Sequence, residues 1–190
     1  RASQGASRPA RPRAGRPPRR ARPRRQPARA MTDLSLEGLA AGLAPRQQLV
    51  GLDVGTRTVG VAVSDSARRI ASPLGTVRRR KFRADAEAVL ALVGARDVGG
   101  WILGLPVEMS GAEGPRAQST RAFARNFGRL TPRPVALWDE RLSTVAAERA
   151  LLEADASRRR RAEVIDHVAA AIILQGALDR LAALEADGGA

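Results

Sequence analysis

The stretch LVGLDVGTRTVGVAVSD, residues 49–65, has the pattern of a β-hairpin. Valines alternate with small residues in its second half, and alternation of this kind is typical of strands. The pattern predicts strands over residues 48–55 and 58–64. The GTRT between them predicts a tight turn, so the two strands are expected to pair antiparallel.

One carboxylate, Asp53, interrupts the apolar first strand of this hairpin. Successive side chains of a strand alternate between its faces, so Asp53 shares its face with Gly51 and Gly55. Glycines beside an acid leave room for a ligand to approach the backbone, which makes Asp53 a candidate site residue. The alternative is a strand-end Asp that accepts a hydrogen bond from a turn amide.

The rest of the chain alternates between strand and helix patterns after a third strand. Strands adjacent in sequence followed by alternating helices and strands imply an α/β fold, with a mixed sheet and helices on its faces. The expected strands are 70–79, 101–106 and 134–140, and the expected helices are 85–98, 116–130, 143–153 and 164–185. Gly99 and Gly100 are the expected C-cap of the first of these helices.

The composition excludes several kinds of chemistry. There is no cysteine and the single histidine is His167, so a His/Cys zinc site cannot be built. Lys81 is the only lysine and no GK[ST] motif occurs, which excludes a P-loop. No stretch approaches the roughly 18 uncharged apolar residues of a membrane span, so we expect no membrane partner. Trp101 and Trp138 are expected to be core residues. Carboxylate chemistry, with or without a hard metal ion, remains.

The net charge of +14 is concentrated at the N-terminus. Residues 1–30 hold 11 Arg, six Pro and no acid, which leaves +3 on the remainder. Such a segment cannot bury apolar surface and is expected to be disordered. We therefore expect residues 1–46 to be an Arg/Pro-rich extension and lead-in, with Met31 as the biological start, and residues 47–185 to be the folded domain. A basic arm that binds nucleic acid is the alternative.

Two further acids stand where the predicted fold would bring them towards Asp53. Active residues of open α/β sheets collect at the carboxyl ends of strands, and Asp139 and Glu140 end the strand 134–140. Alternation puts these two on opposite faces, so only one of them can meet Asp53. Asp166 lies in the expected first turn of the last helix, where small neighbours such as Ala169 allow close packing on the sheet. Three converging carboxylates repel one another unless a cation neutralises them. Mg²⁺ or Mn²⁺ is the natural choice because both prefer oxygen ligands.

Four blocks in this order closely resemble the YqgF (RuvX) family: GLDVGTRTVGVAVSD, WILGLPVEMSGAEGPRAQSTRAFA, LWDERLSTVAAERAL and VIDHVAAAIILQGALD. The resemblance covers about residues 47–182. It implies a ribonuclease H-like fold, with a five-stranded mixed sheet whose first three strands are antiparallel. It also implies a nuclease of precursor 16S rRNA related to Holliday-junction resolvases, with Asp53, Glu140 and Asp166 as catalytic acids.

On this basis the expected function is a metal-dependent endonuclease that processes the 5′ end of precursor 16S rRNA. Asp53, Glu140 and Asp166 would hold one or two Mg²⁺ or Mn²⁺ ions. Arg57, Arg141 and the loop 107–116 would position phosphates. A second candidate surface is a run of four arginines, Arg158, Arg159, Arg160 and Arg161, although such a run is usually a solvated loop.

Three alternatives remain open from the sequence. A DNA junction resolvase would use the same acids on branched DNA. An actin-like or sugar-kinase ATPase also has a DVGTRT-like motif, but it needs a second domain. A ribosome-assembly factor would bind RNA without cutting it. The expected setting is the cytoplasm, with ribosomal particles as partners and a monomer or weak dimer as the oligomeric state.

Overall fold

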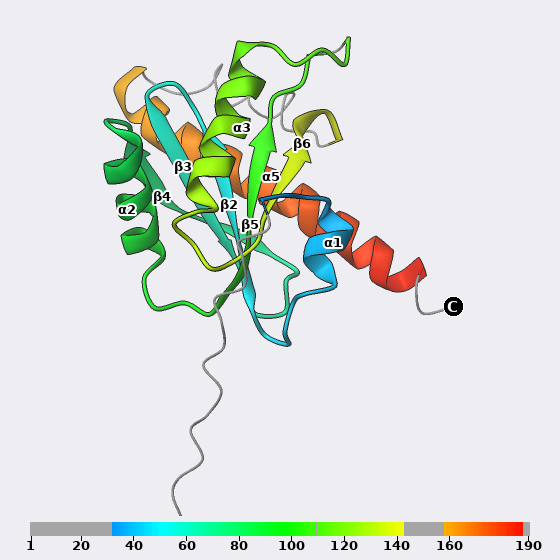
Figure 1. Ribbon diagram of the computed structural model, residues 1–190. Helices are drawn as coiled ribbons and strands as arrows, with labels where there is room; N and C mark the ends of the chain where they lie inside the picture. The colour runs from blue at the N-terminus through cyan, green and yellow to red at the C-terminus, as the bar shows by residue number, and fades with distance from the viewer. Residues whose placement is uncertain (1–31, 109, 143–157, 188–190) are drawn as a thin grey trace, which may run out of the picture.

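The computed structural model describes residues 32–108, 110–142 and 158–187, which form one sheet with helices on both faces (Figure 1). The strands are β1 (Thr32–Leu34), β2 (Gln48–Val54), β3 (Thr58–Ser64), β4 (Ala71–Arg78), β5 (Val98–Leu105) and β6 (Val135–Asp139). The helices are α1 (Leu36–Ala40), α2 (Phe82–Val93), α3 (Pro115–Phe127), the 3₁₀ turn η1 (Glu140–Leu142) and α5 (Arg158–Asp187). The helix expected over 143–153 lies outside the described residues.

The sheet has the strand order β1-β6-β5-β2-β3-β4. β2, β3 and β4 pair antiparallel, whereas β5 and β6 join β2 in parallel. This confirms the mixed ribonuclease H-like sheet of five strands, with the first three antiparallel. The three-residue β1 adds a short sixth strand at the edge, parallel to β6.

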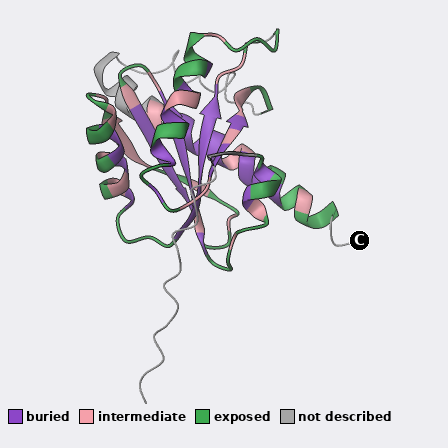
Figure 2. Cartoon of the chain, in the orientation of Figure 1, coloured by how far each residue is buried: buried purple, intermediate pink, exposed green. Residues whose placement is uncertain are grey.

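The two faces of the sheet carry separate hydrophobic cores. The face under α2 and α3 packs Val50, Leu52 and Leu103 against those helices, and the opposite face packs Leu49 and Ile102 against α5. α5 crosses that second face in Figure 1, and the central strands are coloured as buried along most of their length in Figure 2. Both sides of the sheet are thus covered, which is why its central strands are buried along almost their whole length.

Both tryptophans are core residues, as expected. Trp101 is 2% exposed, donates from Nε1 to the Thr131 hydroxyl at 3.0 Å, and packs edge-on against Phe127 with ring centroids 4.8 Å apart. Trp138 is 6% exposed on the α5 face. Neither ring is available as an open stacking platform for bases.

The folded domain begins earlier than residue 47, so the expected boundary is wrong. Leu36 and Leu39 of α1 are buried against the α5 face of the sheet. Ser35 caps this short helix by accepting a hydrogen bond from the backbone N–H of Gly38. Two leucines within a five-residue helix are too short a pattern for the helix to be identified from the sequence. Because both leucines are buried in the core, residues 32–46 are part of the domain.

Gly99 and Gly100 were expected to cap a helix but lie in β5. α2 ends instead at Gly94, whose φ of +64° is the left-handed conformation that favours glycine. A Cβ on Gly99 would stand 2.7 Å from Leu43 Cδ2, and one on Gly100 would stand 2.8 Å from Leu39 Cδ1. These two glycines therefore admit the α1 region onto the sheet.

The last helix is more apolar than expected from the sequence, in which no stretch was predicted to approach a membrane span. Residues Asp166–Asp187 are long and apolar enough, by length and composition, to span a membrane. Core helices of globular proteins pass the same test, and Ile173, Leu174 and Leu178 of this helix are buried against the sheet. Its hydrophobicity is accounted for by this packing.

Candidate active site

Asp53 is a buried acid near the carboxyl end of β2, with 4% of its surface exposed. Its strand neighbours Leu52 and Val54 belong to the core under α2 and α3. Leu49, an even number of positions away, belongs to the core under α5. By alternation Asp53 lies on the α5 face.

A glycine on the neighbouring strand brings Asp53 close to Asp166. Asp53 pairs with Gly60 across the antiparallel β2–β3 ladder, where opposed Cα atoms are about 4.5–5.5 Å apart. A Cβ on Gly60 would stand 1.9 Å from the backbone oxygen of Asp166. The absent side chain of Gly60 therefore lets α5 rest on β3 at Asp166, one strand away from Asp53.

A second glycine does the same for Glu140 on the other side. The parallel register of β2 and β5 ends at Leu52 and Leu103, and one residue further along come Asp53 and Gly104. A Cβ on Gly104 would stand 2.6 Å from Glu140 Oε1. The carboxylate of Glu140 thus lies over β5, beside the strand that carries Asp53.

Three acids from β2, η1 and α5 therefore gather on one face at one end of the sheet. Asp53 is central, and the glycines that flank it across the strands admit Glu140 on one side and the backbone of Asp166 on the other. Within residues 32–108, 110–142 and 158–187, no group of three or more His, Asp or Glu side chains could hold a metal ion as it stands. The backbone brings the acids together, and their side chains would still need to turn to one point.

The position of Asp166 in its helix differs from the expectation. α5 begins at Arg158, so Asp166 lies in the helix interior rather than in the first turn, and the dipole of the helix end does not account for it. Ala169 and Ala170, its small neighbours, are buried as expected. Close packing on the sheet is therefore the reason why Asp166 reaches this face.

The glycines along β2 do not leave the space for a ligand that was expected. A Cβ on Gly51 would stand 2.7 Å from Leu174 Cβ and 2.8 Å from the backbone oxygen of Ala170. Gly55 forms the turn, where its N–H donates to the carbonyl of Thr58 at 2.9 Å. Gly51 thus accommodates α5.

Asp139 and Glu140 lie on opposite faces, as alternation predicts. Val135 and Leu137 pack with the α2/α3 core, which places Asp139 on that face. The Asp139 carboxylate accepts from the backbone N–H of Arg141 at 3.0 Å and from its guanidinium at 2.6 Å. The hydrogen bond from Arg141 lowers the pKa of Asp139 below its usual value. Asp139 is thus engaged by Arg141 and turned away from Asp53.

The structure describes the side chains of only some of the arginines that were expected to contact phosphates. Arg57 is exposed in the β2–β3 turn. Arg141 is exposed and paired with Asp139. The side chains of Arg158, Arg159, Arg160 and Arg161 lie outside the described residues. Gly111 shapes the 107–114 loop with a φ of +86°, and a Cβ there would be 3.8 Å from an Arg141 nitrogen.

His167, the single histidine, was given no role from the sequence. Its Nδ1 is 3.1 Å from the hydroxyl of Thr76, which pairs with Gly60 across the β3–β4 ladder. Thr76, Gly60 and Asp53 thus form one row across three strands. The Thr76–His167 bond ties α5 to this row next to Asp166.

Gly60 was not singled out from the sequence either. The hairpin register, fixed by the turn between Gly55 and Thr58, could have predicted that Asp53 and Gly60 lie opposite each other.

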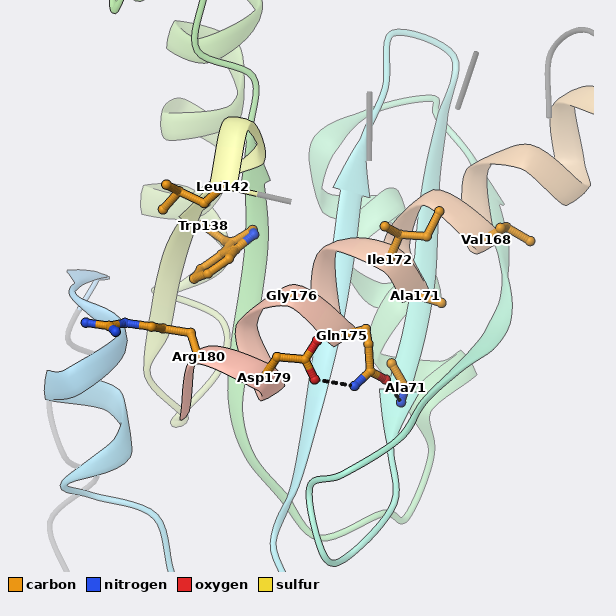
Figure 3. A pocket seen from close by; sticks show the side chains of 10 residues that line it. All are labelled: Ala71, Trp138, Leu142, Val168, Ala171, Ile172, Gln175, Gly176, Asp179 and Arg180. Carbon is orange, nitrogen blue, oxygen red and sulfur yellow. Dashed lines mark hydrogen bonds between the residues drawn. The ribbon is translucent and has the colours of Figure 1, made fainter. Parts of the chain in front are cut away.

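A cavity of about 930 Å³ lies along α5 (Figure 3). Trp138 and Leu142 line it from the β6 side, and Ile172 and Gln175 line it from α5. The Nε1 of Trp138 has no hydrogen-bond partner in the described part of the chain. Asp53, Glu140 and Asp166 are absent from the described lining residues, so this cavity is separate from the acids.

Comparison with known proteins places the chain among nucleases. The sequence profile of the RuvX family, described as Holliday junction resolvase, matches residues 47–180. A protein of Rhodobacter capsulatus named "Putative pre-16S rRNA nuclease" is 63% identical over 149 residues, which span 78% of this chain and 94% of that protein. Its namesake from Paracoccus denitrificans is 65% identical over 147 residues, spanning 77% and 93%.

Among solved structures, T. thermophilus RuvC in complex with Holliday junction substrate aligns with 71% of this chain and 96% of its own, at 14% identity and a TM-score of 0.43. Likeness at that level says nothing about activity. The family profile spans most of the chain, and the two bacterial relatives match nearly over their full length. The chain therefore belongs to the RuvX family and is a nuclease, a hydrolase of phosphodiester bonds.

Proposed function

We propose that this nuclease is a metal-dependent endonuclease that processes the 5′ end of precursor 16S rRNA. The observation that supports it most directly is the placement of Asp53 between Gly60 and Gly104, which admit the other two acids from either side. The names of the bacterial relatives supply the RNA substrate.

Asp53, Glu140 and Asp166 are the proposed ligands of one or two Mg²⁺ or Mn²⁺ ions. Their donors are carboxylate oxygens, which suit these ions, and the composition contains no cysteine that would favour zinc. When bound, such ions activate a water molecule and stabilise the leaving oxygen of a phosphodiester. The donor chemistry of these three residues thus fits such ions.

The residues of the chain divide the remaining work. Asp53 is buried on a central strand, so its carboxylate is a fixed point for the site. Glu140 and Asp166 stand on elements that pack onto glycines, which sets their distance from Asp53. Arg57 and Arg141, exposed at the same end of the sheet, would bind substrate phosphates.

The proposed setting follows from the proposed substrate. A nuclease of precursor rRNA acts in the cytoplasm and meets its substrate on ribosomal particles. We also propose that the protein acts as a monomer or weak dimer.

A DNA four-way junction is the second candidate substrate, because the RuvX family is described as Holliday junction resolvase. The two are separated by incubating the protein with a precursor-rRNA leader and with a four-way DNA junction, each in Mg²⁺, Mn²⁺ or EDTA. Cleavage of the leader at a defined position, absent in the variant Asp53→Asn, supports the proposal. Cleavage of the junction with an intact leader would establish the second candidate instead.

A further inference from the structure

A basic segment, VRRRKFR over residues 77–83, leads from the end of β4 into α2. Arg78, Arg80 and Lys81 are exposed, whereas Arg79 is partly buried. Arg57, exposed in the β2–β3 turn, lies next to them because Thr58 pairs with Arg78 across the β3–β4 ladder. We call Arg57, Arg78, Arg80 and Lys81 the basic strip.

The backbone under the strip is held by a set of hydrogen bonds. The N–H of Arg79 donates to the carbonyl of Arg57 at 2.8 Å. The N–H of Arg80 donates to Oδ1 of the buried Asp85 at 2.7 Å, and the N–H of Asp85 donates to the carbonyl of Lys81 at 3.0 Å. A backbone ordered in this way loses little further entropy when its side chains bind a ligand.

Arg79 braces the strip against the active-site end of the sheet. Its guanidinium donates to the carbonyl of Gly55 at 2.7 Å and lies 3.8 Å from an Asp85 oxygen. It also stands over the ring of Phe123, 5.9 Å from the centroid. Gly55 is two residues beyond Asp53, so this brace fixes the strip beside the end of the strand that carries the central acid. Because its guanidinium makes these contacts, Arg79 is not counted among the ligand-binding side chains, whereas Arg78, Arg80 and Lys81 are exposed.

We propose that the basic strip binds the sugar–phosphate backbone of the nucleic-acid substrate and leads it to Asp53. This inference rests on the proposed function. In the part of the chain that the structure describes, the side chains of Arg57, Arg80 and Lys81 form no ion pair. Exposed cations at neighbouring positions match the repeating charge of a phosphate backbone, which is recognised without reading bases.

The test is binding of a fluorescently labelled RNA hairpin with a single-stranded 5′ tail, measured in EDTA so that cleavage does not interfere. The variant Arg80→Ala/Lys81→Ala removes two strip cations. Arg125→Ala/Arg129→Ala is the matched control: it removes two exposed charges, one in the last turn of α3 and one just after the helix ends. We expect the strip variant to raise Kd by about tenfold or more at 100 mM salt and to lower the slope of log K against log salt by about one to two.

The control should change Kd less than about twofold, and melting curves of both variants should overlay that of the parent protein. Equal Kd and equal salt slope for the strip variant and the parent would overturn the strip and identify it as a solvated turn. Failure of the proposed function is a separate result. If the parent protein binds the hairpin but never cleaves a leader RNA, the rRNA-processing activity is wrong, while weaker binding by the strip variant still supports the strip.

Discussion

Asp139 holds Arg141 with both of its oxygens, whereas the adjacent Glu140 places Oε1 over Gly104 on the other side of the sheet. Nε of Arg141 lies 3.1 Å from each Asp139 oxygen, and a terminal nitrogen lies 2.6 Å from Oδ2. A Cβ on Gly104 would be 2.6 Å from Glu140 Oε1. Two neighbouring acids of the same sequence block thus have different partners and different faces.

The first prediction separates these two acids. Glu140→Gln keeps the size of the side chain and removes its charge, so we expect cleavage to fall by at least about a hundredfold, roughly 2.7 kcal/mol of barrier. We expect Asp53→Asn to reduce cleavage by a similar factor. Asp139→Asn should cost much less, because that carboxylate supports Arg141 and its backbone amide. Single-turnover rates, with melting curves as the folding control, decide between them. A dead Asp139→Asn beside an active Glu140→Gln would reverse the assignment.

The second prediction concerns the metal. The proposed ligands are all carboxylates, so activity should disappear in EDTA and return with Mn²⁺ or Mg²⁺ without any requirement for Zn²⁺. Calorimetric titration of the parent protein with Mn²⁺ should show binding that Asp53→Asn weakens by at least about tenfold. Full cleavage in the chelator would show that the acids serve some other purpose.

The third prediction concerns the contact between β3 and α5. Gly60→Ala puts a Cβ within 1.9 Å of the Asp166 backbone oxygen, so α5 must move away from the sheet. We expect the free energy of unfolding to fall by about 2 kcal/mol or more in urea titrations, with cleavage lost. Gly75→Ala is the control on β4. Its Cβ would meet only the flexible end of Leu92 at 3.2 Å, and it should cost less than about 1 kcal/mol. If both variants lose the same free energy of unfolding, the contact between Gly60 and Asp166 does not fix the position of α5 on the sheet.

The fourth prediction concerns acid stability at the turn after β3. The Asp65 carboxylate accepts from the N–H groups of Ile70 at 2.9 Å and Arg69 at 2.7 Å, and these bonds lower its pKa. A lowered folded-state pKa stabilises the fold above the unfolded value of about 3.9, and this contribution is lost as pH falls through the folded value.

Asp65→Ala should therefore lower the free energy of unfolding by about 1–2 kcal/mol at pH 7, as removal of a capping side chain does. The difference from the parent protein should shrink towards pH 3. Urea titrations at both pH values measure it, with Glu185→Ala, exposed near the end of α5, as the control. A difference that is the same at both pH values would contradict the role of the charged carboxylate.

The fifth prediction concerns the start of the domain. A chain that begins at Met31 should melt at an unchanged temperature and retain cleavage, since the composition of residues 1–30 cannot contribute a core. A chain that begins at Gln47 loses the buried Leu36 and Leu39 and should be about 2–4 kcal/mol less stable. A loss of RNA affinity of tenfold or more on removing residues 1–30 would make that segment a functional arm.

The hairpin and its central acid could be predicted because their signals are local. Alternation set the faces of β2 and β3, and the short turn fixed the register that opposes Asp53 to Gly60. The same reasoning separated Asp139 from Glu140. The approach of Glu140 to Gly104 depends on the parallel register of β5 with β6, and the position of Gly104 beside Asp53 depends on that of β2 with β5. Long crossovers set both registers, and no short pattern encodes them.

Gly99 and Gly100 illustrate why part of the fold could not be predicted. A glycine after a helical pattern looks the same whether it caps the helix or makes room for a packed side chain in a strand. Here the deciding contact comes from Leu39 and Leu43, in a segment too short and too weakly patterned to be recognised. Of the basic strip only Arg57 was predicted from the sequence, because the position of the other members beside the end of β2 depends on the hydrogen bond from Arg79 to Gly55.

The packing of α5 on Gly60 also determines when the acids can first meet. Asp53 is carried by a hairpin synthesised early, whereas Asp166 belongs to the last helix that the structure describes. A nascent chain that has folded its first three strands therefore has the central carboxylate but lacks the one that α5 brings. On the proposed assignment of Asp53, Glu140 and Asp166, the set of acids is complete only when α5 is packed on the sheet, so cleavage would require this helix to be in place.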